Sequence, residues 1–77
     1  GYILNIKEVT MQVNVEDCWC GGNKWKWRLE FTVYGATVRE CIYHEEGESW
    51  NRSTARLAKD IISENYGVSV SSIRFSV

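Results

Sequence analysis

The chain has 77 residues, of which 44% are hydrophobic and 13% aromatic, and its formal net charge is −1. This composition is too apolar for a disordered chain, and no apolar run approaches the roughly 18 residues that cross a bilayer. The small net charge gives no general attraction to nucleic acid or to an anionic membrane. Three cysteines are an odd number, which argues against a disulfide framework and favours a reducing, cytoplasmic compartment. We expect residues 1–77 to form one small domain, and the initial glycine suggests a fragment or a tag remnant.

The first hairpin is predicted from two segments in which apolar and polar residues alternate, over residues 9–16 and 24–34. The apolar parity changes upstream of residue 9, which predicts a bulge near Lys7 and Glu8. Residues 21–23 are Gly-Gly-Asn, which tolerate positive φ and predict a three-residue loop. With this loop Cys20 pairs with Lys24 and Trp19 pairs with Trp25, and the apolar faces of both strands lie on the same side of the sheet.

A second hairpin is predicted at Gly35 and Ala36, followed by a third strand that runs to about residue 45. In this register Glu40 lies opposite Phe31 on the apolar face. Such a position requires either a longer turn or an edge location with a partner such as an arginine.

A helix is predicted after residue 49, with Ser49 or Ser53 as its N-cap and Gly67 as its C-terminal stop. Its apolar stripe has spacings of three and four and consists of Trp50, Thr54, Leu57, Ala58, Ile61 and Ile62. A last strand over residues 73–77 is expected to cross back and run parallel to the first. The predicted fold class is therefore α+β: a small, mostly antiparallel four-stranded sheet in the order β-β-β-α-β, with one helix packed on one face.

The order of three strands and a helix resembles the arm-type DNA-binding domains of phage integrases and, more loosely, the second half of a double-stranded-RNA-binding domain. The last strand departs from both. The resemblance concerns topology, and topology alone does not carry function.

Four side chains could form a zinc site, because Cys18, Cys20, Cys41 and His44 offer ligands that zinc accepts. The predicted register places Cys18 level with Lys26 and Cys41 level with Glu30, roughly 13 Å apart along the strands, and turns His44 to the face opposite Cys41. This geometry favours free thiols over a metal site or a disulfide, so we expect no cofactor. We also expect no enzymatic activity, because His44 is the only histidine and no nucleotide-binding or metalloprotease motif is present.

Cations and one aromatic ring are predicted on the outer face of the sheet: Lys24, Lys26, Arg28, Arg39 and Tyr43. A face of this kind can follow phosphates and stack bases. The predicted register, however, places Glu16 opposite Arg28 and Glu45 opposite Lys26, which reduces the positive charge. Trp19, beside a glycine turn, is difficult to bury and is a candidate interface residue.

These observations predict a non-catalytic protein-interaction module that binds through the exposed sheet face and the turn over residues 18–23. The predicted contact residues are Trp19, Lys24, Lys26, Arg28, Arg39 and Tyr43. The size of the chain suits a small inhibitor or adaptor, such as those that phages and mobile elements encode against host machinery, including nucleic-acid-guided defence complexes. The alternatives are a nucleic-acid-binding domain and a zinc-stabilised ribbon, and the oligomeric state is left open.

Overall fold

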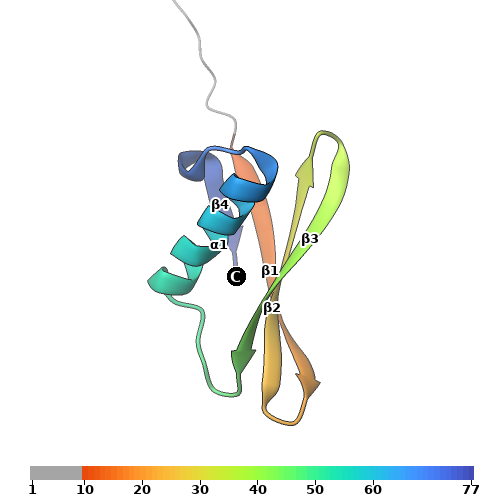
Figure 1. The fold of residues 1–77 in the computed structure, drawn as a ribbon, viewed down its shortest axis with the longest axis vertical. Helices are drawn as coiled ribbons and strands as arrows, with labels where there is room; N and C mark the ends of the chain where they lie inside the picture. The colour runs from red at the N-terminus through yellow and green to blue at the C-terminus, as the bar shows by residue number, and fades with distance from the viewer. Residues whose placement is uncertain (1–9) are drawn as a thin grey trace, which may run out of the picture.

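The computed structural model describes residues 10–77, which form a mixed four-stranded sheet and one α-helix (Figure 1). Its elements are β1 (Met11–Gly21), β2 (Lys24–Val33), β3 (Ala36–Glu45), α1 (Arg52–Tyr66), the 3₁₀ turn η1 (Val70–Ser72) and β4 (Ile73–Ser76). The predicted α+β class is confirmed. The irregularity predicted near Lys7 and Glu8 lies outside the described residues. Within residues 10–77 no helix is both long and apolar enough to cross a membrane.

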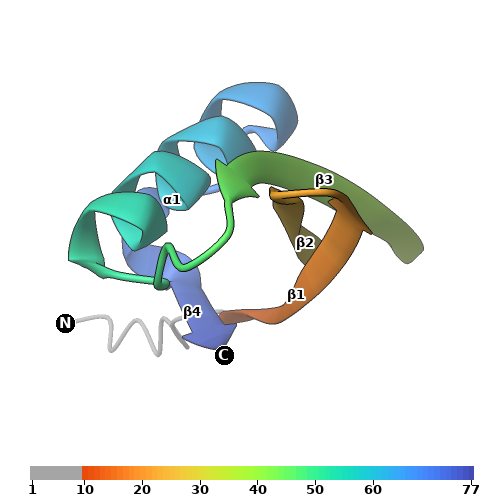
Figure 2. The same ribbon diagram turned by 90° about the horizontal axis from the view of Figure 1, so that it is seen from below.

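The strands are arranged in the order β3-β2-β1-β4, so β3 and β4 form the two edges of the sheet. Both hairpins are antiparallel, whereas β4 runs parallel to β1, with Met11 opposite Ile73. This agrees with the predicted return of the last strand to the side of the first. In Figure 2, α1 lies over one face of the curved sheet and leaves the other face open.

The first hairpin confirms the pairing of Trp19 with Trp25 but corrects the loop. The predicted pair of Cys20 with Lys24 is wrong, because Gly21 pairs with Lys24 and the register shifts between Trp19 and Gly21. The shift is a β-bulge at Cys20, and Gly21 accommodates it with a φ of 105°. The bulge absorbs one residue of the predicted loop and leaves a two-residue turn.

The second hairpin turns one residue earlier than predicted, at Tyr34 and Gly35, and Val33 pairs with Ala36. Both turn residues have positive φ, 50° for Tyr34 and 78° for Gly35. Positive φ at both central positions is the type I′ geometry, whose twist matches that of the two strands. The sequence prediction was wrong because a tyrosine rarely occupies such a position. The predicted β2–β3 register is therefore wrong by two residues, a shift that leaves every side chain on its predicted face.

Glu40 is the residue that this change of register affects most, because it lies opposite Leu29 rather than Phe31. It still lies on the helix side of the sheet, and its partner is not an arginine. The Tyr66 hydroxyl, at the end of α1, donates a hydrogen bond of 2.5 Å to Glu40 Oε1. This hydrogen bond raises the pKa of Tyr66, and burial and the negative charge of Glu40 raise it further.

The helix begins after Asn51, whose side chain accepts a 2.9 Å hydrogen bond from the Thr54 backbone N–H. The predicted caps Ser49 and Ser53 are therefore wrong, although serine and asparagine side chains can both accept this bond. The predicted C-terminal stop is confirmed, because Gly67 adopts the left-handed conformation with a φ of 68°.

The hydrophobic core lies between α1 and the sheet face that it covers. Its buried residues come from every strand except β3 and from two positions of the helix: Val13, Val15, Trp27, Leu29, Phe31, Val33, Ala58, Ile62 and Ile73. Apolar alternation in the strands and the helical spacing of Ala58 and Ile62 thus meet in one layer.

Candidate interaction surface

Five of the six predicted contact residues lie together on the open face of the sheet. Lys26 sits between Cys18 and Tyr43 in one row of the sheet, and Arg28 sits between Glu16 and Cys41 in the next. Lys24 and Arg39 share this parity on β2 and β3. The open face therefore gathers the predicted cations and the Tyr43 ring, whose exposed fraction is 73%.

Carboxylates neutralise part of this open face. Arg28 forms an ion pair with Glu16, as the predicted register required, and Arg39 Nε lies 2.8 Å from Glu30 Oε2. The prediction that Glu45 faces Lys26 is wrong, because the corrected register places Glu45 opposite Lys24. Exposed pairs of this kind stabilise a protein by about 0–1 kcal/mol. Their larger effect here is that the face carries mixed charge rather than a continuous positive field.

Trp19, the sixth predicted contact residue, lies on the other side of the sheet. It shares a row and a face with Trp25 and His44, at the end of the sheet that projects below α1 in Figure 1. Its exposed fraction is 65%, yet its indole N–H donates a 3.0 Å hydrogen bond to the Gly22 carbonyl. We call this end of the sheet the aromatic end; it comprises Trp19, Trp25 and His44 on the helix side and Tyr43 on the open face.

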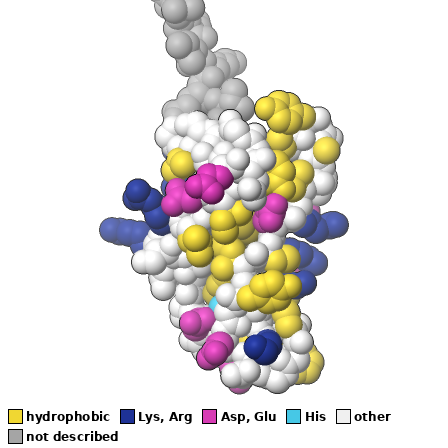
Figure 3. All heavy atoms as spheres, viewed as in Figure 1, with side chains coloured by type: hydrophobic (Ala, Val, Ile, Leu, Met, Phe, Trp, Pro, Cys, Tyr) yellow, Lys and Arg dark blue, Asp and Glu magenta, His cyan; other side chains and the backbone are white. Residues whose placement is uncertain are grey.

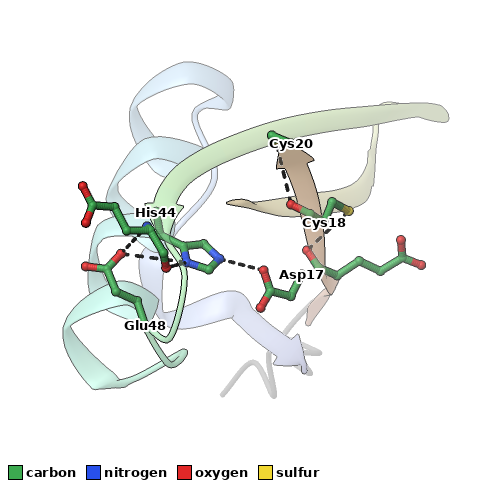
Figure 4. A network of polar contacts seen from close by, with 7 residues as sticks. Asp17, Cys18, Cys20, His44 and Glu48 are labelled. Atoms are coloured by element: carbon green, nitrogen blue, oxygen red, sulfur yellow. Dashed lines mark hydrogen bonds and ion pairs between the residues drawn. The ribbon is translucent and has the colours of Figure 1, made fainter. Parts of the chain in front are cut away.

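His44 is the centre of a polar network at this aromatic end, and its side chain is only 5% exposed. Its Nε2 lies 2.6 Å from Asp17 Oδ1 on β1, and its Nδ1 lies 2.7 Å from the Glu45 carbonyl oxygen. Glu48, in the loop before α1, places Oε2 3.8 Å from Nδ1. Figure 4 shows Asp17 and Glu48 approaching the ring from two sides. The network therefore links β1, β3 and the loop that leads into the helix.

Both ring nitrogens of His44 face acceptors, and only the protonated imidazolium can donate from both. Burial lowers the pKa of His44, but the hydrogen bonds to Asp17 and to the Glu45 carbonyl, with the charges of Asp17 and Glu48, outweigh it and raise the pKa above 6.5. The ring also stacks on Trp27, with centroids 4.1 Å apart and planes 16° apart. A cation over an indole face is a favourable arrangement.

The same geometry separates the four candidate zinc ligands. Cys18 and Cys41 lie on the open face, whereas His44 lies on the opposite face with both nitrogens engaged. In Figure 4, the sulfur of Cys18 points away from His44. Cys41 is level with Arg28, not with Glu30 as predicted, and all three cysteines are free thiols. Across residues 10–77 no group of three His, Cys, Asp or Glu side chains has an arrangement that could hold a metal ion.

A groove of about 410 Å³ continues from the aromatic end between β3 and α1. Trp27 and Ile42 contribute apolar side chains from the sheet, and Leu57 contributes one from the helix. Leu57 was predicted as part of the buried helix stripe, but it is 50% exposed. Figure 3 shows the corresponding band of apolar side chains between α1 and β3. The helix thus buries Ala58 and Ile62 and leaves its neighbouring apolar position open to solvent.

Asp17 and Leu57 are the residues of this surface that sequence reasoning missed. Asp17 follows the alternating segment at a position of apolar parity, where a carboxylate needs a partner, and among residues 10–77 that partner is His44. Leu57 gives no comparable signal, because a leucine at helical spacing predicts a core residue.

A comparison of the chain with protein-family models, with curated proteins and with solved structures finds no match.

Proposed function

We propose that the chain is a non-catalytic protein-interaction module and that the aromatic end is its main contact surface. The observation that carries the proposal is Trp19, a side chain both largely exposed and held in place by its bond to the Gly22 carbonyl. Tryptophan and tyrosine are the residue types most enriched at the energetic centres of protein interfaces. A side chain that is already fixed loses less conformational entropy when a partner covers it.

The surroundings of Trp19 support the same proposal. Trp25 lies beside it, and the Trp25 Nε1 group is buried without an acceptor among the described residues. Trp25, Tyr43 and His44 also line a hollow of about 230 Å³ that can receive a side chain. This hollow and the groove between β3 and α1 together form an apolar surface interrupted by a few polar groups, which is typical of an interface centre.

We also propose that the chain has no enzymatic activity. While His44 donates from both nitrogens it has no lone pair, so it can neither activate a nucleophile nor bind a metal. A cytoplasmic location and a role as a small phage or mobile-element inhibitor are further parts of the proposal. The free thiols fit a reducing compartment.

The test compares Trp19→Ala with a matched change at the opposite hairpin turn, Tyr34→Asn. Each form serves as bait in extract of the source cells, and the retained proteins are quantified by mass spectrometry before affinities are titrated with the purified partner. We expect Trp19→Ala to weaken binding at least tenfold, because an interface centre contributes about 2 kcal/mol or more. Tyr34→Asn should bind as the unmodified chain does. Unchanged affinity of Trp19→Ala, or equal losses in both variants, contradicts the proposed surface.

Nucleic-acid binding through Lys24, Lys26, Arg28 and Arg39 is the competing proposal. Ion pairs already engage Arg28 and Arg39, which leaves two lysines without an ion-pair partner among the described residues. A low-salt titration with oligonucleotides distinguishes the two, since phosphate contacts give an affinity that falls steeply with salt.

A further inference from the structure

The outer edge of β3 is long, regular and unpaired within the described part of the chain. It runs for ten residues, pairs with β2 without a shift in register, and contains no proline. Edges are usually protected by prolines, bulges or short length, because their free backbone groups otherwise pair with another strand. The opposite edge, β4, is only four residues long.

The backbone groups that face this edge belong to the odd-numbered residues of β3. The Glu46 N–H donates to the Asn23 carbonyl on the β2 side, whereas the Glu45 N–H donates to the Glu48 side chain on the outer side. Because successive residues of an antiparallel strand alternate in this way, the N–H and C=O groups of Thr37, Arg39, Cys41 and Tyr43 point outwards. These groups set the register that any added strand must follow.

The sequence of β3 complements itself when a second copy runs antiparallel about a two-fold axis at Ile42. Ile42 then meets the partner's Ile42 on the groove side, and Cys41 meets the partner's Tyr43 on the open face. Arg39 meets the partner's Glu45. Opposite charges therefore face each other across the axis.

Two registers shifted towards the β2–β3 turn match less well. An axis at Glu40 places that carboxylate against the partner's Glu40, and like charges directly opposite are destabilising. An axis at Cys41 places Glu40 against the partner's Ile42. We therefore propose that a second copy of this chain occupies the β3 edge, with the two-fold axis at Ile42, and joins the two sheets into one.

This arrangement also covers part of the groove. Ile42 lines the groove beside Leu57, and a strand added next to β3 lies about 4.8 Å further out, with its inward side chains over the same space. The partner's Ile42 then covers apolar surface that is open in the single chain. Trp19 lies on β1, two strands away from this edge, so it stays exposed in both copies, whereas Tyr43 becomes part of the strand pairing.

The first experiment is sedimentation velocity of the reduced protein from micromolar to millimolar concentration. We expect a species of twice 8.9 kDa that gains population with concentration. Cys41→Pro should shift the sample to the monomer, because it removes an outward N–H and, at an edge position, no bond to β2. Cys41→Ser keeps that N–H and should behave as the unmodified chain. A monomer at every concentration, or a dimer that Cys41→Pro leaves intact, overturns the proposal.

The second experiment tests the register and does not depend on a proline variant. Three single-cysteine forms, made by replacing the other cysteines with serine, carry their thiol at Ile42→Cys, at native Cys41 or at native Cys20. Diamide oxidises two thiols to a disulfide and takes up the two hydrogens. An axis at Ile42 brings the two Cα atoms of residue 42 to about 4.5 Å, within disulfide range, and holds the Cys41 pair at about 7–8 Å.

We expect the Ile42→Cys form to become covalently dimeric at least tenfold faster than the Cys20 form, which reports random collision. Faster linkage through Cys41 than through residue 42 overturns the proposed axis. Linkage of both at the collision rate overturns the edge pairing itself and leaves the β3 edge open to a strand of another protein. None of these outcomes bears on the contact made by Trp19, so the two proposals fail independently.

Discussion

The two ends of the sheet are held together by different interactions. Beneath α1 the core consists of apolar side chains, among which Leu29, Ala58, Ile62 and Ile73 are fully buried. At the aromatic end the helix no longer covers the sheet, and the His44 ring, held by Asp17 and stacked on Trp27, packs against it instead. The comparison shows how a small domain can remain folded beyond its helix while it keeps a neighbouring surface open.

The two kinds of interaction respond to different conditions. Aliphatic burial is non-directional, contributes roughly 25 cal/mol per Å² and does not depend on pH. The His44 network is directional, and its strength depends on the protonation of one ring. Changes at the two ends should therefore differ in both size and pH dependence.

The largest effect is expected from Leu29→Ala in the covered core. Removing a buried leucine side chain costs about 2–5 kcal/mol, because the site cannot collapse fully around the cavity. The matched control is Leu57→Ala, the same substitution at a half-exposed position of the groove. Urea denaturation followed by circular dichroism should show a large loss for Leu29→Ala and a change below about 1 kcal/mol for Leu57→Ala. Equal losses would contradict the distinction between core and groove.

The covered end of the molecule is also the part that sequence predicts well. Alternation in β1 and β2 and the spacing of Ala58 and Ile62 require one buried layer, and these patterns depend only on residue type. The positions of the two turns were less predictable, because they depend on a bulge at Cys20 and on positive φ at Tyr34. The predicted and the observed turn positions satisfy the same apolar pattern.

The aromatic end was predicted only in part. Trp19 could be identified as exposed because it lies beside a glycine turn. The contact between Asp17 and His44 could not, because it joins two strands that are separated by β2 and depends on how the sheet curves. Sequence spacing describes neighbours along a strand or in a pair of strands, but not side chains that meet above a third.

A smaller and pH-dependent effect is expected at the His44 network. The folded chain raises the pKa of His44 above 6.5, so the ring binds its proton more tightly when folded. The resulting stabilisation is fully present below about pH 6.5 and is lost as the pH rises through the folded-state pKa. Asp17→Asn removes the negative charge that favours the protonated ring and leaves a neutral, weaker acceptor in its place, so it should make stability less dependent on pH.

The measurement is the free energy of unfolding in urea at pH 6 and pH 8, a range in which His44 is the only histidine to titrate. We expect the unmodified chain to lose stability between the two values and Asp17→Asn to lose less. Glu16→Gln, at the neighbouring exposed position, is the control and should follow the unmodified chain. An identical pH dependence in all three would mean that the contact between Asp17 and His44 does not stabilise the fold.

The smallest effect is expected at the β2–β3 turn, and it has the opposite sign. Tyr34 has a φ of 50° and is 95% exposed, so its ring contributes almost no packing while its backbone occupies a region that a bulky residue rarely adopts. Asparagine before glycine is the preferred pair for a type I′ turn, so Tyr34→Asn should stabilise the fold by about 0.5–1 kcal/mol. Tyr34→Ala removes the same ring without the asparagine preference and should show no such gain. Thermal unfolding of the two variants separates the effect of backbone strain from the effect of losing the ring. An equal gain in stability in both variants would show that the exposed ring, and not the backbone conformation, destabilises the unmodified chain.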